Sequence, residues 1–222
     1  KKLVQEILKK NNEEKKPSEY SIENYHKKIN YLLKFIDKHS KKENNPSQED
    51  TIIYNCISCV IGAFLGDAIG SYCEFTKFNK LNFIQIWNEK NKIWKTKKGQ
   101  ITDDSEMAIS LAYGIMNDLS INQNSICFFY SFWFFSQPFD IGNTTYNTFM
   151  DIERKKIGKI KISDCTENKY FKEKCIKNSK KYNSNSLSNG FLMRNTPIAV
   201  FLFLKNREKF LKFFQPLKNL VT

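Results

Sequence analysis

The stretch TDDSEMAISLAYGIMN, residues 102–117, decides the fold class of this 222-residue chain. Its apolar residues, among them Met107, Leu111 and Ile115, recur at the spacing that places side chains on one face of an α-helix. A second stretch, QNSICFFYSFWFF at residues 123–135, is apolar on nearly all sides, which is typical of a buried helix. The two stretches predict a core made of helices.

Helical spacing extends over most of the chain beyond residue 47. We expect about seven helices there, over residues 51–69, 102–117, 123–135, 142–155, 169–181, 189–205 and 207–214. Alternating strand patterns are almost absent, and no repeat of constant period indicates a solenoid. Residues 76–100 are polar and aromatic and give no firm prediction. The predicted fold class is therefore all-α.

The N-terminal part of the chain differs in composition from the rest. Residues 1–17 are charged, and residues 18–39 carry apolar side chains at helical spacing, so one amphipathic helix is expected there. Residues 41–46 are polar and typical of a linker. We therefore divide the chain into a polar extension, residues 1–46, and a helical domain, residues 47–222.

The charge and the cysteines narrow the classes of function. The net charge is +13, but the cations are overwhelmingly lysines mixed with Asn and Glu, which favours solvated faces over a nucleic-acid surface. Six scattered cysteines indicate a reducing, cytoplasmic compartment, and Cys56 and Cys59 are expected to pack in a helix. The sequence contains no uninterrupted run of 18 apolar residues, so it predicts no membrane span. Because the sequence begins at Lys1 and not at a methionine, it leaves open whether an upstream piece or a targeting peptide precedes it.

Two clusters of carboxylates interrupt the helical pattern. Asp67 lies within an apolar helix, where it needs a partner, and Glu74 follows Gly70, which is expected to end that helix. Thr102, Asp103 and Asp104 open the next helix with one hydroxyl and two carboxylates, the oxygen ligands that Mg²⁺ prefers. Taken alone, the local sequence favours ordinary helix capping for these residues over a metal site.

Two further clusters are polar turns. The stretch PFDIGNTT, residues 138–145, offers Asp140 and Asn143 either as helix caps or as parts of a ligand-binding turn. The stretch SNSLSNG, residues 184–190, presents hydroxyls and amides before an expected helix, which suits phosphate but also suits a solvated linker. Arg194 is expected one turn into that helix.

Taken together and in order, these clusters resemble the ADP-ribosylglycohydrolase family. The matching stretches are GAFLGDAIGSYCE, ITDDSEMAISLA, PFDIGNTTYNTF and SLSNGFLMRNTPIAVF, which together span residues 62–201. The resemblance implies an orthogonal bundle of helices around a cleft with two Mg²⁺ ions. It also implies hydrolysis of the glycosidic bond that links ADP-ribose to a protein side chain or small acceptor. Residues 47–222 would then be the N-terminal portion of such a domain.

The resemblance assigns roles to particular residues. Thr102, Asp103 and Asp104 match the metal ligands, and Glu74 matches the acidic residue of a loop that closes over the site. With Asp103 and Asp104 this makes three candidate catalytic carboxylates, among which acid and base stay open. The ADP-ribose-binding loop corresponds to Ser184, Ser186, Ser188, Asn189 and Gly190. The stretch containing Asp140 matches a signature for which only a supporting role is inferred.

The chain departs from the family in one respect. Family members supply further metal ligands from an Asp-x-Asp-Thr or Asp-x-Asp-Ser stretch nearer the C-terminus, and no aspartate follows Gly190 here. The simplest expectation is a chain truncated at its C-terminus. The expected partner is an ADP-ribosylated protein or small conjugate, and a monomer is favoured. The alternative is a catalytically inactive relative that binds ADP-ribose or serves structurally.

Overall fold

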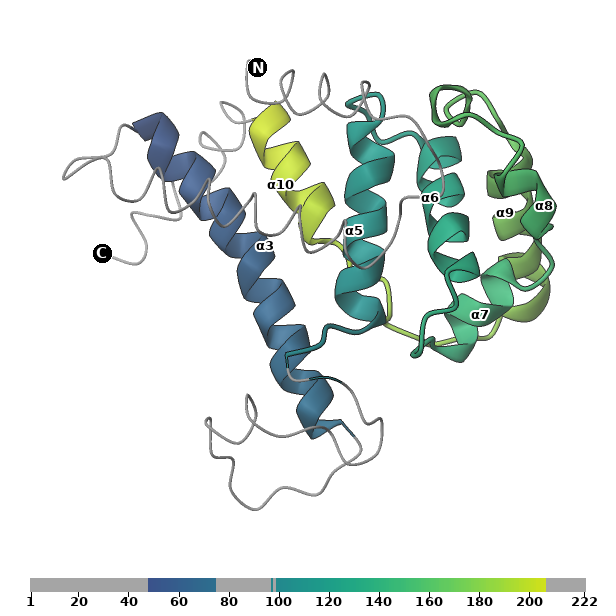
Figure 1. Cartoon of the computed structure of the whole chain (residues 1–222), viewed down its shortest axis with the longest axis horizontal. Helices are drawn as coiled ribbons and strands as arrows, with labels where there is room; N and C mark the ends of the chain where they lie inside the picture. Colours follow the sequence, from purple (N-terminus) through teal and green to yellow (C-terminus); the bar gives the residue numbers. More distant parts are fainter. Residues whose placement is uncertain (1–47, 75–96, 98, 207–222) are drawn as a thin grey trace. The chain divides into compact units, whose positions relative to one another are not determined.

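A computed structural model describes residues 48–74, 97 and 99–206 (Figure 1). All regular structure in these residues is helical, which confirms the all-α class. The helices expected over residues 18–39 and 207–214, the linker at 41–46 and most of residues 76–100 lie outside the described residues. The division of the chain at residue 47 stays a prediction.

Seven α-helices and one 3-10 helix make up the described part of the chain. In order they are α3 (Gln48–Cys73), α5 (Asp103–Met116), α6 (Gln123–Phe135), α7 (Asn143–Phe149), α8 (Arg154–Ile157), η2 (Ile162–Asp164), α9 (Tyr170–Tyr182) and α10 (Thr196–Lys205). The helices predicted at 102–117, 123–135 and 169–181 are confirmed within one residue at each end.

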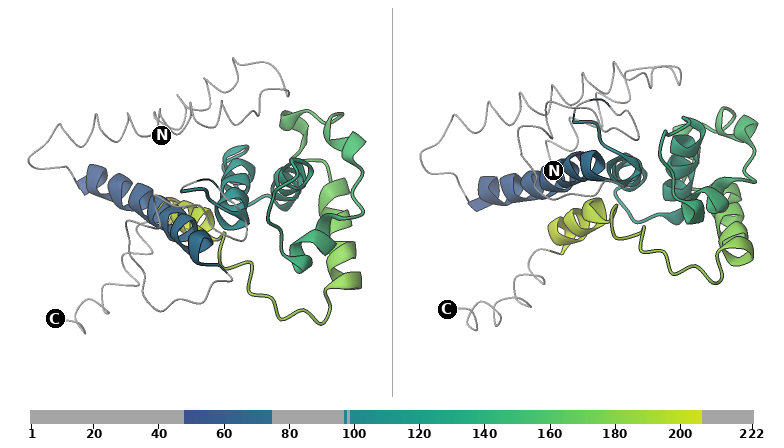
Figure 2. Two further views of the ribbon diagram at one scale, coloured as in Figure 1. Left: turned by 60° about the horizontal axis from the view of Figure 1, so that its bottom comes forward. Right: turned by 90° about the horizontal axis from the view of Figure 1, so that it is seen from below.

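Helix α6 lies at the centre of the packing. It contacts α5 on one side and α9 on the other, while α10 packs on the far side of α5, and α7 packs against α9 (Figures 1 and 2). The buried core joins α5, α6, α7 and α9 through Met107, Phe128, Trp133, Phe149 and Phe171. The fully buried Phe171 ring meets Phe128 edge to face, with 5.4 Å between ring centroids.

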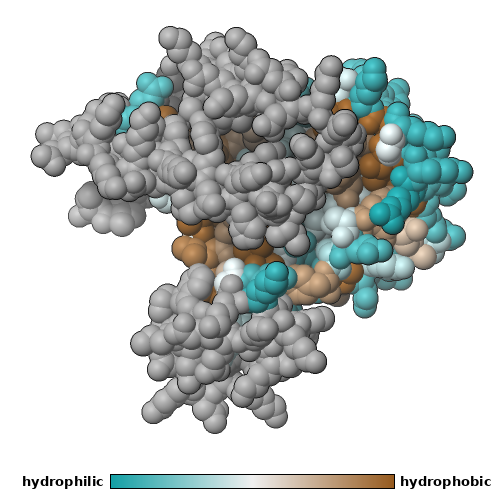
Figure 3. Space-filling model, in the orientation of Figure 1, coloured by the Kyte–Doolittle hydropathy of each residue, from teal (hydrophilic) through white to brown (hydrophobic). Residues whose placement is uncertain are grey.

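The outer side of this packing is polar. Helix α9 carries lysines on the face that it does not bury, and Figure 3 shows hydrophilic residues gathered over α8 and α9. Phe171 and Cys175, one turn apart, are buried on the opposite face of α9. The positive charge of this helix therefore lies on a solvated face.

Two predicted helix boundaries in the second half of the chain are wrong. The helix expected over residues 142–155 is two helices, α7 and α8, because the chain turns after Phe149 so that both Phe149 and Ile152 enter the core. The helix expected from Asn189 begins only at Thr196, where Pro197 occupies the first turn. Arg194 therefore precedes α10 instead of lying within it.

Helix α3 is longer than predicted. It continues through Gly70 to Cys73, so that Gly70 does not end it, and Glu74 follows the last helical residue directly. Nothing among the described residues approaches a Cβ built at Gly62, Gly66 or Gly70, so these glycines serve no close helix contact there.

By length and composition, residues 49–72 of α3 are sufficient to cross a membrane, a feature that the search for uninterrupted apolar runs missed. Length and hydropathy alone are weak evidence for a span. The last turns of α3 are held by hydrogen bonds from Asp67 and Ser71 to residues 100–105.

Candidate active site

Asp67 of α3 caps the N-terminus of α5 from a distance. One carboxylate oxygen accepts the backbone N–H groups of Thr102 at 2.9 Å and Ser105 at 3.1 Å. The other accepts the hydroxyl of Thr102 at 2.7 Å. Since Thr102 makes no capping hydrogen bond within α5, Asp67 provides the partner for the free amides of this helix end. The expectation that Asp67 needs a partner is confirmed.

Ser71, one turn after Asp67, fixes the chain that leads into α5. Its hydroxyl lies 3.1 Å from the carbonyl oxygens of Ala68 and Gln100. Ser71, Thr102 and Asp103 are all buried, so these contacts are shielded from water. The end of α3 and the start of α5 thus form one hydrogen-bonded unit.

This unit forms the wall of a cavity of about 390 Å³, which we call the acidic cavity. Its lining residues come from the end of α3, the start of α5 and the loop before α7. They are Gly66, Asp67, Gly70, Ser71, Glu74, Thr102, Asp103, Asp104 and Asp140. Among the described residues, five carboxylates and no cationic side chain line it.

The crowding of carboxylates disturbs their protonation. Burial, followed by the negative charges of Asp140, Asp104 and Asp67, raises the pKa of Asp103 to about 7, although the backbone N–H of Gly142 opposes the shift. Burial first, then Asp67 and Asp140, raises the pKa of Asp104. Burial and Asp67 also raise the pKa of Asp140. The site therefore holds more negative charge than its described surroundings stabilise.

Glu106, one turn further along α5, belongs to the same electrostatic group. It accepts a 2.7 Å hydrogen bond from the indole N–H of Trp133 on α6. Burial raises the pKa of Glu106, and the bond from Trp133 lowers it in part. This contact ties the acidic end of α5 to the core.

The structure brings four of the predicted site residues into one cavity. Glu74, Thr102, Asp103 and Asp104 all line it, although Glu74 is 28 positions away from the other three in sequence at the nearest. Asp140, for which only a supporting role was inferred, lines the same cavity. Its position in a turn between two helices was the available signal, but capping explained it equally well.

The predicted ADP-ribose-binding loop lies elsewhere. None of Ser184, Ser186, Ser188, Asn189 and Gly190 lines the acidic cavity. The Ser186 hydroxyl instead lies 2.9 Å from that of Thr144 on α7, and the Ser188 hydroxyl accepts the N–H of Gly190 at 3.3 Å. The loop runs into a turn before α10 and not into a helix N-terminus, because α10 begins at Thr196. Its role stays a prediction.

The donor set of the acidic cavity fits a hard divalent cation. Among the described residues, every side-chain atom of the lining that can bind a metal ion is an oxygen. The Thr102 hydroxyl donates its proton to Asp67, which leaves the lone pairs of the Thr102 oxygen available. A cation there would offset the repulsion that raises the pKa of Asp103. Among the described residues, however, no group of three or more His, Cys, Asp or Glu side chains is arranged to hold a metal ion. Thr102, Asp103 and Asp104 would therefore supply only part of a ligand shell.

The raised pKa of Asp103 predicts a pH-dependent stability in metal-free buffer. The folded state binds the proton of Asp103 more tightly than the unfolded state, with a pKa of about 7 against 3.8. Stability should therefore fall as the pH rises from about 4 to about 7. Asp103→Asn should remove this fall and be more stable than the wild type at pH 8, by on the order of 2 kcal/mol.

Urea unfolding of both proteins in EDTA at pH 4 and pH 8 tests this prediction. The exposed Glu173→Gln variant is the control, because it removes one carboxylate outside the cavity. A difference between Asp103→Asn and the wild type that is the same at both pH values would contradict the predicted titration.

The chain is similar to proteins of one family. The family model described as ADP-ribosylglycohydrolase matches residues 48–215. A putative ADP-ribosyl glycohydrolase of Acanthamoeba polyphaga mimivirus is 35% identical over 144 residues, which cover 62% of this chain and 38% of the relative. The ADP-ribosyl-(dinitrogen reductase) glycohydrolase of Rhodospirillum rubrum is 36% identical over 93 residues, which cover 38% of this chain and 31% of the relative.

No solved structure matches the chain. The chain spans less than two fifths of the length of these curated relatives. The family match nevertheless covers three quarters of the chain and includes every residue that lines the acidic cavity. The chain therefore belongs to the ADP-ribosylglycohydrolase family.

Proposed function

We propose that the acidic cavity is a catalytic site that hydrolyses the glycosidic bond between ADP-ribose and an acceptor, with Mg²⁺ bound. The observation that carries the proposal is the meeting of Glu74, Thr102, Asp103 and Asp104 in one cavity, whose described lining has no cationic side chain. An ADP-ribosylated protein is the proposed substrate class, by analogy with the name of the Rhodospirillum rubrum relative. The free cysteines of the described residues support a reducing, cytoplasmic compartment.

The chain's own residues divide the work as follows. Thr102, Asp103 and Asp104 would hold Mg²⁺, which when bound would polarise the oxygens that it contacts. Asp103 or Asp104 accepts a proton from the attacking water, whose oxygen forms a bond to the anomeric carbon of the ribose. Glu74 donates a proton to the leaving acceptor atom as the glycosidic bond breaks. Asp67 is a positioning residue, because it orients Thr102 and the start of α5.

Isothermal titration of ADP-ribose into the chain, with Mg²⁺ or with EDTA, tests this proposal. We expect binding that depends on Mg²⁺ and that weakens by more than about tenfold in the Asp103→Ala, Asp104→Ala double variant. The Glu167→Ala, Glu173→Ala double variant removes two carboxylates from exposed positions outside the cavity and should bind as the wild type does.

The remaining outcomes separate the alternatives. Binding of ADP-ribose that is equal with Mg²⁺ and with EDTA would favour a catalytically inactive ADP-ribose-binding relative. Absence of binding by a sample that unfolds cooperatively on heating would overturn the proposed site in this chain.

A further inference from the structure

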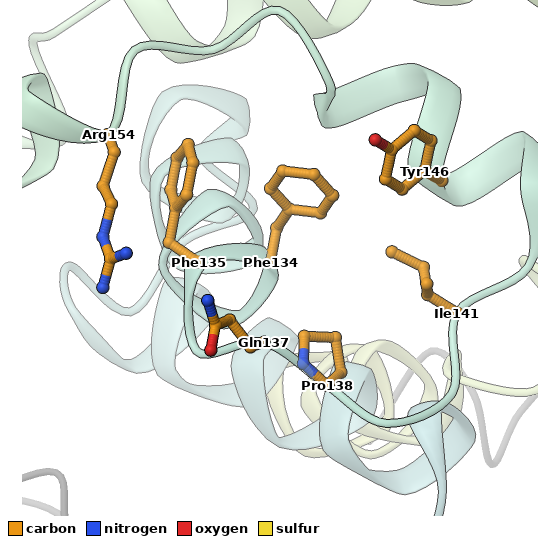
Figure 4. A pocket seen from close by; sticks show the side chains of 7 residues that line it. All are labelled: Phe134, Phe135, Gln137, Pro138, Ile141, Tyr146 and Arg154. Atoms are coloured by element: carbon orange, nitrogen blue, oxygen red, sulfur yellow. The ribbon is translucent and has the colours of Figure 1, made fainter.

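A second cavity, of about 290 Å³, opens where α6 ends and α7 begins (Figure 4). We call it the aromatic cavity. Phe134 lies between two other rings of its lining, with centroid distances of 5.2 Å to Phe135 and 5.7 Å to Tyr146. The Tyr146 side chain is 48% exposed although it is large and apolar over most of its surface. The volume lies just below the range of ligand pockets, roughly 300–1,000 Å³, and is enough for one planar ring system.

Arg154, a cation with no partner among the described residues, also lines the aromatic cavity. Helix α8 begins with three basic residues, of which Lys155 pairs with Glu153 at 3.2 Å and Lys156 lies 4.5 Å from the centroid of the Tyr170 ring. Arg154 forms no ion pair and covers no ring among the described residues, and its side chain lines the aromatic cavity. Its guanidinium offers several donors in a plane, the geometry that binds phosphate.

Gln137 adds a second hydrogen-bond donor to the aromatic cavity, and its backbone is strained. It follows the C-terminus of α6 with a φ of 61°, in the left-handed region where glycine is the usual residue. Its side chain lines the cavity, and Figure 4 shows its amide and the Arg154 guanidinium on the Phe135 side, away from Tyr146. Strained residues of this kind cluster at sites that hold ligands.

We propose that the aromatic cavity binds a nucleotide, with the planar base against Phe134 and Tyr146 and a phosphate at Arg154 and Gln137. Aromatic rings stack on bases of any sequence, and a free guanidinium supplies the charge that a phosphate needs. The acidic cavity has the opposite charge and would repel a bare phosphate. The proposal does not depend on the proposed function of the acidic cavity.

The two cavities share one loop. Pro138 and Ile141 line the aromatic cavity, whereas Asp140 between them lines the acidic cavity. A nucleotide in the aromatic cavity would therefore contact the loop that carries Asp140. The same chemistry is offered by a free mononucleotide and by the adenylate part of an ADP-ribose conjugate, and the experiment distinguishes these two sources.

Isothermal titration of AMP into the whole chain, in EDTA, tests the site. Arg154→Gln should weaken AMP binding by roughly tenfold, and Tyr146→Leu by at least about fivefold. Lys155→Gln is the matched control for Arg154, because it removes the adjacent charge, and Tyr182→Leu is the control for the loss of an exposed ring. Neither control should change the affinity.

The Gln137→Gly variant separates binding from folding. Glycine relieves the strain at φ 61°, so the Tm should rise by roughly 2–4 °C while AMP binding weakens. Loss of affinity in a more stable protein cannot be caused by unfolding. A Gln137→Gly protein that binds AMP as tightly as the wild type would remove Gln137 from the site.

Titration with ADP-ribose distinguishes a free mononucleotide from the adenylate part of an ADP-ribose conjugate as the ligand of the aromatic cavity. Competition with AMP that depends on Arg154 indicates the adenylate part of a conjugate, and absence of competition indicates a free mononucleotide. The proposal is overturned if AMP does not bind the folded wild type, or if AMP binding is abolished by Asp103→Asn and unaffected by Arg154→Gln. The latter result would place AMP in the acidic cavity and leave the proposed function standing.

Discussion

Asp67→Ala should lower the free energy of unfolding by about 3 kcal/mol, with a fall in Tm of roughly 6–12 °C. The variant removes the acceptor that serves the Thr102 and Ser105 N–H groups and the Thr102 hydroxyl. The two amides belong to the first turn of α5, where no residue of the helix itself can accept them. Because Thr102 and Ser105 are buried, water replaces the carboxylate poorly.

Repulsion within the acidic cavity opposes this loss but does not outweigh it. Asp67 raises the pKa of Asp103, Asp104 and Asp140, so its removal relieves some repulsion. For Asp103, however, Asp67 is the smallest of the charge effects, after Asp140 and Asp104. Three hydrogen bonds to one carboxylate at a helix N-terminus are the larger contribution.

Asp67→Asn is the matched variant, because it keeps one acceptor oxygen and removes the charge. It should cost clearly less than Asp67→Ala in urea unfolding at pH 7. Asp67→Ala should also weaken Mg²⁺-dependent binding of ADP-ribose, since Thr102 loses the contact that orients its hydroxyl. Equal stability of the two variants and the wild type would show that Asp67 does not cap α5.

The sequence predicted the helices of the core well, because their side chains follow one period. Helix α6 is predicted over its full range from its nearly continuous apolar pattern, and in the structure Asn122 caps it by accepting hydrogen bonds from the N–H groups of Asn124 and Ser125. Short helices were harder. The split between α7 and α8 follows from Phe149 and Ile152 both packing into the core, and a local pattern does not contain that tertiary requirement.

Only some of the residues that line the acidic cavity were predicted as site residues, and the architecture of the cavity was not predicted. Thr102, Asp103 and Asp104 were identified through oxygen chemistry and family resemblance, and Glu74 through resemblance. That Asp67 organises them depends on a contact across 35 positions, which no local signal encodes. The aromatic cavity was missed for the same reason, because Arg154 and Tyr146 were expected within a single continuous helix.

Gly114→Ala should be the most damaging small substitution in the core, at about 3 kcal/mol. A Cβ at this position of α5 would lie 2.8 Å from the Cα and 3.2 Å from the backbone nitrogen of Ile126 on α6. These are backbone atoms, so no rotamer change relieves the contact, and the two helices must move apart. Their separation would disturb Met107 and Phe128, which pack in the same core.

The opposing effect of helix propensity is smaller. Alanine is favoured over glycine within a helix by about 1 kcal/mol, which offsets only part of the overlap. Gly62→Ala on α3 isolates that gain, because nothing among the described residues lies within 4 Å of its added Cβ. Urea unfolding should therefore give opposite signs, with Gly62→Ala stabilised by up to about 1 kcal/mol and Gly114→Ala destabilised. A Gly114→Ala variant as stable as Gly62→Ala would show that α5 and α6 do not pack as closely as the structure has them. The hydrogen bond from Trp133 of α6 to Glu106 of α5, which depends on the same packing, would then be contradicted as well.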